Sequence, residues 1–83
     1  MVSKEDHETY RALVYTLCDR FMIAADPVTV TIRVNINGIK YKYAVISVAL
    51  IGFHINLHDR CGRHVSKTFL TSINGTLEYM LRL

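Results

Sequence analysis

The 83-residue sequence has no tryptophan, one proline, two cysteines and four glycines. So little proline and glycine excludes collagen-like and low-complexity chains, and 51% hydrophobic residues with only 20% charged residues exclude intrinsic disorder. A chain of this length is expected to form a single domain over residues 1–83, because two cores would each be too small to be stable alone.

Long apolar runs are also missing. The longest nearly unbroken one, residues 43–53, is about half of the roughly 20 residues that a membrane-spanning helix requires, and Ser47 and Gly52 interrupt it. The first residues, Met-Val-Ser-Lys-Glu-Asp-His-Glu, lack the apolar core of a signal peptide. We therefore expect no membrane partner and a cytoplasmic location.

The first segment has the pattern of an amphipathic helix. Ser3 can cap its start, since a serine side chain accepts a backbone N–H of the first turn. Apolar residues that recur every three or four positions predict one buried stripe: Tyr10, Leu13, Val14, Leu17, Cys18 and Phe21. We expect the helix to begin near Lys4 and the segment to end at Asp26 and Pro27, because proline lacks the N–H and restricts the residue before it.

The next segment alternates between apolar and polar residues, which predicts a strand buried on one side. Asn-Gly at residues 37–38 favours a two-residue type I′ hairpin. That loop would place Val34 opposite Tyr41 and Arg33 opposite Lys42. One face of the hairpin would then be apolar and the other basic.

In this register Tyr43 would point into the core, while Ile46, Val48 and Leu50 would lie on the opposite, outer face. A strand that is apolar on both sides is either central or part of an interface. We therefore expect these three residues to form a patch through which the protein forms a homodimer.

Two further strands are predicted beyond Gly52. Residues 53–58 alternate in polarity, residues 59–62 (Asp-Arg-Cys-Gly) favour a tight turn closed by glycine, and a last strand runs from Arg63 to about Phe69. His58 would lie opposite His64, and Val65 and Phe69 would join the core.

The last segment, residues 71–83, fits either a short helix or a second hairpin, and its good helix formers favour the helix. The predicted fold is α+β, with an N-terminal amphipathic helix, a four-stranded antiparallel sheet and a short C-terminal helix, both helices lying mainly on one face.

Charge is distributed unevenly along the sequence. Residues 1–26 carry a net charge of −2, whereas residues 27–71 contain six basic residues and one acidic residue, a net charge of +5. Long basic side chains are often simply solvated, or the acidic helix could neutralise them. The alternative is that a partner supplies the missing negative charge, and the residues expected to contact it are Arg33, Lys40, Lys42, Arg60 and Arg63.

Nucleic acid is a second possible partner. An open basic sheet that binds single strands normally carries aromatic residues on which bases stack. The predicted register turns both Tyr41 and Tyr43 toward the core, which makes nucleic-acid binding the less favoured alternative.

Zinc binding or thiol chemistry is a third possible function, because four potential ligands lie within eleven residues: His54, His58, Cys61 and His64. Their spacing matches no standard zinc finger, so we assign no metal ligand and no cofactor. The two cysteines have no paired spacing that would indicate a disulfide framework.

Motifs of catalysis are missing: the sequence has no glycine-rich phosphate loop and no nucleophile elbow. We therefore expect a non-catalytic protein that binds a partner protein with an acidic surface, as an inhibitor or adaptor. Chains of this size include phage-type antagonists of host defence complexes such as CRISPR–Cas, an analogy of size and composition alone.

Overall fold

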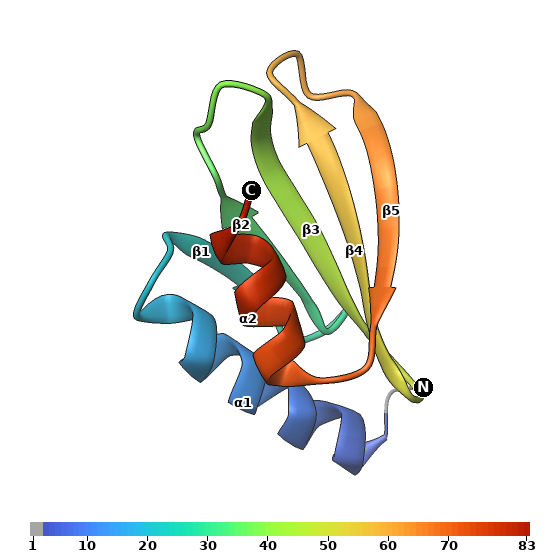
Figure 1. The fold of residues 1–83 in the computed structure, drawn as a ribbon. Helices are drawn as coiled ribbons and strands as arrows, with labels where there is room; N and C mark the ends of the chain where they lie inside the picture. Colours follow the sequence, from blue (N-terminus) through green and yellow to red (C-terminus); the bar gives the residue numbers. More distant parts are fainter. Residues whose placement is uncertain (1–2) are drawn as a thin grey trace.

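The computed structural model describes residues 3–83 and shows an α+β fold (Figure 1). The elements are α1 (Lys4–Cys18), β1 (Ile23–Asp26), β2 (Thr31–Asn35), β3 (Tyr41–Ala49), β4 (Gly52–Asp59), β5 (His64–Leu70) and α2 (Ile73–Leu81). The predicted class and both terminal helices are confirmed. The sheet has five strands instead of the predicted four.

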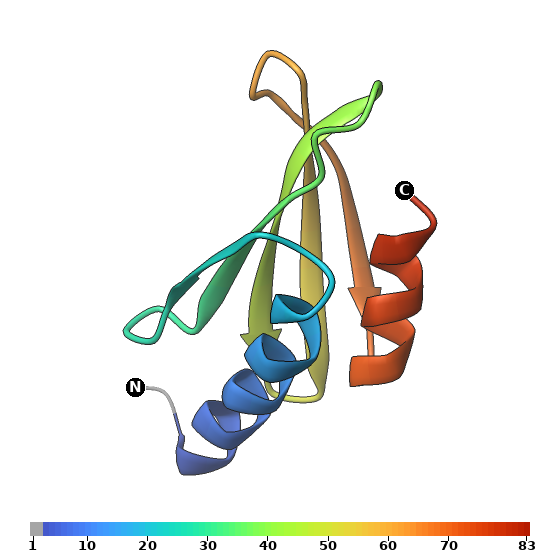
Figure 2. The same cartoon turned by 90° about the vertical axis from the view of Figure 1, so that its left-hand side faces the viewer.

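The strands form one antiparallel meander in the order β1-β2-β3-β4-β5. Both helices lie on the same side of this twisted sheet (Figures 1 and 2). We call the covered side the inner face and the opposite side the outer face. The β2–β3 loop and the β4–β5 turn lie together at one end of the sheet, at the top of Figure 1, and the β3–β4 turn lies at the other end.

The core fills the space between the inner face and the two helices. Of the stripe predicted for the first helix, three residues are at most 5% exposed and Val14 and Phe21 pack against them, whereas Cys18 is exposed. The buried apolar residues are Tyr10, Leu13 and Leu17 of α1, Met80 of α2, and Val30, Ile32, Val34, Ala44, Ile46, Phe53, Ile55 and Leu57 of the sheet and the turn before β2.

Each helix begins after a serine that satisfies a backbone N–H of its first turn. The Oγ of Ser3 accepts the N–H of Asp6 at 3.1 Å, and the Oγ of Ser72 accepts that of Gly75 at 2.9 Å. The C-terminal segment is thus a helix and not the alternative hairpin. Within residues 3–83, neither helix has the length and apolar character needed to cross a membrane.

The first helix is shorter than predicted. It ends at Cys18, and residues 23–26 form the edge strand β1, which the sequence analysis missed. The N–H groups of Arg20 and Phe21 both donate to the carbonyl of Leu17, at 3.0 and 2.9 Å, and this closes the helix. Two of the four residues of β1 are alanines, which favour strands poorly, so the local sequence carries no strand signal.

The pairing of β2 with β3 also differs from the prediction. A five-residue loop, residues 36–40, joins the two strands, and Val34 lies opposite Ala44 instead of Tyr41. A type I′ turn requires positive φ at both central residues, and of the Asn-Gly pair only Asn37 has it, at 51°. The predicted two-residue hairpin is therefore wrong, and the register differs by three residues.

An offset of an odd number of residues exchanges the two faces of β3. Ile46 is fully buried in the core, Val48 packs against the core, and Leu50 is 89% exposed in the β3–β4 turn. The apolar patch predicted on the outer face is therefore wrong, and the homodimer interface inferred from it has lost its basis. Tyr43, predicted to point inward, lies on the outer face instead and stacks on His58.

A second register difference occurs in β5. His58 lies opposite His64 as predicted, but the register shifts by one residue next to this pair, which leaves Val65 as an extra residue in a bulge. Phe69 therefore lies opposite His54 on the outer face and not in the predicted core position.

Because the two faces of β3 are exchanged relative to the prediction, substitutions at Ile46 and Leu50 should differ in their effect on the free energy of unfolding. Ile46→Ala should lower the free energy of unfolding by about 2–5 kcal/mol, because it leaves a cavity in the core. Leu50→Ala should change it by less than about 0.5 kcal/mol, because the side chain is already in water. Urea denaturation followed by circular dichroism measures both, and equally small effects would contradict the observed register.

Candidate functional site

Four of the five basic residues predicted to contact a partner meet at one end of the sheet. Lys40 lies in the β2–β3 loop, Lys42 lies near the start of β3, Arg60 lies in the β4–β5 turn, and Arg63 lies just before β5; all four are exposed. The two connections lie close together at the top of both views (Figures 1 and 2). We call these four residues the basic end.

A hydrogen bond joins the two connections that carry the basic end. The Nη1 of Arg60 donates to the carbonyl oxygen of Gly38 at 3.2 Å. The β2–β3 loop is also closed on its own side, since the N–H groups of Ile36 and Asn37 both donate to the carbonyl of Lys42 at 3.0 Å. The cations are therefore presented by backbone held in one arrangement, which lowers the entropy lost on binding.

Asp59 is the one acidic residue between positions 27 and 71, and its carboxylate is hydrogen-bonded within the β4–β5 turn. Its Oδ1 accepts the N–H groups of Cys61 and Arg63 at 2.9 and 3.0 Å, and its Oδ2 lies 3.7 Å from the Nε of Arg63. The hydrogen bond that the Asp59 carboxylate accepts from the backbone N–H of Arg63 is the main reason that the pKa of Asp59 lies below its ordinary value. Gly62 completes the predicted turn with a φ of 84°.

Arg33, the fifth predicted contact residue, lies on the outer face and begins a row of side chains that crosses four strands. Its guanidinium carbon is 3.9 Å from the centroid of the Tyr43 ring. The Tyr43 ring stacks on His58 with centroids 4.5 Å apart and planes at 13°, and His58 meets His64 at 5.5 Å in an edge-on arrangement. We call these four residues the outer-face row.

Tyr43 is covered on both sides within this row. Arg33 comes from β2 and His58 comes from β4, and β3 lies between these strands, so the two side chains reach the ring from opposite directions. A ring whose faces are both occupied has no free π surface on which a nucleobase could stack. The outer-face row is thus a self-contained stack of cation and aromatic groups.

The residues considered as metal ligands do not converge. The Nδ1 of His58 lies 3.2 Å from the carbonyl oxygen of Gly62, and the Nε2 of His64 lies 3.1 Å from the Oδ1 of Asn56. Cys61 is exposed in the turn. In the chain from residue 3 onward, no three His, Cys, Asp or Glu side chains are close enough to hold a metal ion.

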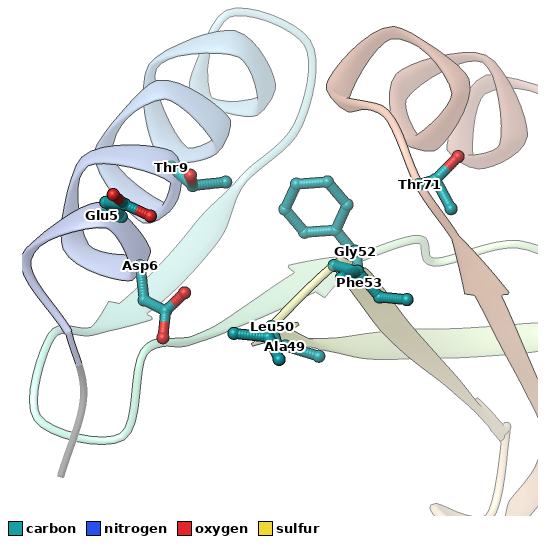
Figure 3. A pocket seen from close by; sticks show the side chains of 9 residues that line it. Glu5, Asp6, Thr9, Ala49, Leu50, Gly52, Phe53 and Thr71 are labelled. Carbon is teal, nitrogen blue, oxygen red and sulfur yellow. The ribbon is translucent and has the colours of Figure 1, made fainter.

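The acidic start of α1 lies at the opposite end of the sheet. Glu5 and Asp6 border a hollow of about 200 Å³ next to the β3–β4 turn, where Leu50 and Ile51 are 89% and 73% exposed (Figure 3). Among residues 3–83 the one ion pair joins Arg63 to Asp59, so no acidic side chain of α1 is paired with a cation of the basic end.

No family model, no curated protein and no solved structure matches this chain. The site is therefore defined by its own side chains.

The sequence analysis missed the outer-face position of Tyr43, although the sequence contains a signal for it. Even-numbered positions of β3 carry only apolar side chains beyond Lys42, whereas Ser47 shares its parity with Tyr43. A polar residue at that parity marks the solvent side of the strand.

Asp59→Ala should lower the thermal midpoint of unfolding at pH 7, because two backbone N–H groups of the turn lose their acceptor. The pKa of Asp59 is lowered by folding, so its contribution to stability is complete above about pH 4 and is lost as the pH falls through the lower, folded value. The difference between wild type and variant should therefore shrink below about pH 4.

Differential scanning calorimetry between neutral and acidic pH measures this difference. Asp19→Ala, which removes an exposed carboxylate outside the turn, is the matched control and should show a much smaller effect at pH 7. A difference for Asp59→Ala that does not change with pH would contradict the assigned role of the carboxylate.

Proposed function

We propose that this chain is a small, non-catalytic protein that binds the acidic surface of a partner protein, as an inhibitor or an adaptor. The observation that carries the proposal is the basic end. Three of its four cations lie on two connections joined by a hydrogen bond, the fourth, Lys42, lies near the start of β3, and the nearby acid, Asp59, is hydrogen-bonded within its own turn. A patch of this kind attracts acidic surfaces, speeds association and selects against basic ones.

The outer face extends this surface. Between β2 and β5 it presents Arg33 and Lys67, and Asp59 at the end of β4 is the one acidic residue of these strands. Arginine and tyrosine are enriched at the centres of protein interfaces, because their planar groups combine packing area with hydrogen bonding. The pair Arg33 and Tyr43 supplies both residue types in a fixed geometry.

The non-catalytic part of the proposal rests on the sequence, which has no glycine-rich phosphate loop and no nucleophile elbow. Small binding proteins of this class include phage-type antagonists of host defence complexes such as CRISPR–Cas, and an acidic face of such a complex suits this surface.

Nucleic-acid binding is the second candidate, and the exposed cations of the basic end and the outer face favour it. The observed register also places Tyr43 on this outer face, whereas the predicted register turned it toward the core. Because both faces of the ring are covered, stacking cannot contribute there, and affinity would depend on phosphate contacts. Such binding would fall steeply with salt concentration.

The proposal predicts that partner binding depends on the basic end. The triple variant Lys42→Gln, Arg60→Gln and Arg63→Gln should bind the partner about five-fold to about a hundred-fold more weakly, since each exposed cation contributes a few tenths to about 1 kcal/mol. The partner is first isolated by affinity capture on the wild-type protein from nuclease-treated lysate, and affinities are then measured with the purified partner.

The matched control neutralises three exposed cations of the N-terminal segment, Lys4→Gln and Arg11→Gln in α1 and Arg20→Gln in the turn after it, and should bind like wild type. Circular dichroism verifies that both triple variants are folded. Equal affinities for the two triple variants would contradict the proposal. Direct binding of an unrelated oligonucleotide with a steep salt dependence, together with capture lost after nuclease treatment, would favour the second candidate instead.

A further inference from the structure

A groove of about 520 Å³ lies beside the basic end, between the β2–β3 loop and the end of α2. This volume falls within the range of about 300–1,000 Å³ that is typical of ligand sites. The groove is lined by Ile36, Gly38, Ile39, Lys40, Tyr41, Arg82 and Leu83.

The lining combines apolar walls with positive charge. Ile39 is 101% exposed and Leu83 is 38% exposed, so apolar surface is in contact with water here. Lys40 and Arg82 supply two cations, and none of the lining side chains is acidic. The Nζ of Lys40 lies 5.3 Å from the centroid of the Tyr41 ring, at the outer limit of a cation–π contact, which leaves the ammonium group free to pair with an anion.

The walls of the groove are fixed before any ligand arrives. The N–H of Gly38 donates to the carbonyl of Tyr41 at 3.0 Å, and the carbonyl of Gly38 accepts the Arg60 side chain at 3.2 Å. On the other wall, the N–H of Arg82 donates to the carbonyl of Glu78 at 3.2 Å and closes α2. A ligand would therefore lose little free energy in ordering the site.

We propose that this groove receives an acidic and apolar segment of the partner protein, with a bulky apolar side chain inserted between Ile39 and Tyr41 and an adjacent Asp or Glu paired with Lys40 and Arg82. The inference rests on the proposed function, because the groove borders the surface that attracts the acidic partner. The exposed Ile39 side chain and the two nearby cations match an apolar side chain with an acidic neighbour, because one supplies apolar contact and the others supply charge complementarity.

Three matched peptide probes test this chemistry: acetyl-Leu-Phe-Asp-Asp-amide, the uncharged acetyl-Leu-Phe-Asn-Asn-amide, and acetyl-Ala-Ala-Asp-Asp-amide without the apolar anchor. Each is titrated into the full-length, ¹⁵N-labelled protein and followed by amide chemical shifts. The first peptide should bind at least about five-fold more tightly than either control, with the largest shifts at Ile39, Lys40 and Arg82.

A pair of double variants locates the binding. Ile39→Ser with Lys40→Gln should weaken binding of the first peptide by about five-fold or more. Val28→Ser with Lys4→Gln removes the same kinds of exposed side chain elsewhere and should stay within about two-fold of wild type. Val28 is 83% exposed, so neither change disturbs the core.

The proposal is overturned if the three peptides bind equally, if none produces saturable shifts, or if the shifts lie on the outer face. It is also overturned if the protein cosediments with phosphatidylcholine–phosphatidylglycerol vesicles through Ile39 and Lys40 while the peptides do not bind, which would assign the groove to anionic lipid. In each case the proposed function stands if the triple variant of the basic end still loses the captured partner, so the two failures are distinguishable.

Discussion

The pairing between β2 and β3 is the constraint on which the rest of the molecule depends. It places Ile32 and Ile46 opposite each other on the inner face, where both are fully buried beneath the helices. A slip of one residue would turn every side chain of β3 to the other face, exposing Ile46 and burying Tyr43. The wide loop at residues 36–40 accommodates this pairing, so the same segment that secures the core also forms one wall of the groove and carries Lys40.

Charge separation follows from this arrangement. The acids of α1 are held at the β3–β4 end, while the cations of the β2–β3 loop and the β4–β5 turn gather at the other end. Exposed cations contribute little affinity individually because they are hydrated and screened, and their main effects are on encounter rate and selectivity. Stable association needs buried apolar surface as well. The basic end and the neighbouring groove together provide both contributions within one small region.

Local signals in the sequence were sufficient for the parts of the fold that depend on local chemistry. The Ser3 cap predicted the start of α1, and the Asp-Arg-Cys-Gly segment predicted the β4–β5 turn and the pairing of His58 with His64. The strand β1 could not be derived in this way, because alanine-rich β1 is a strand only through its contact with β2. The β2–β3 register was missed because the Asn-Gly pair favoured a two-residue turn, although Ser47 marked the outer face of β3. The basic residues of the candidate site were identified from the charge distribution in the sequence. The outer-face row and the groove could not be identified in that way, because they depend on the strand register and on the path of the β2–β3 loop.

The meander topology has a consequence for how the chain reaches its folded state. Every strand of the sheet pairs only with strands adjacent in the sequence, so each pairing step closes a short segment and costs little chain entropy. The longer-range contacts are those of α1 with β3 and with α2, and the second of these joins the two terminal segments. Each hairpin therefore closes at a low cost in chain entropy, whereas the packing of α1 against α2 closes a much longer segment and couples the two ends of the chain.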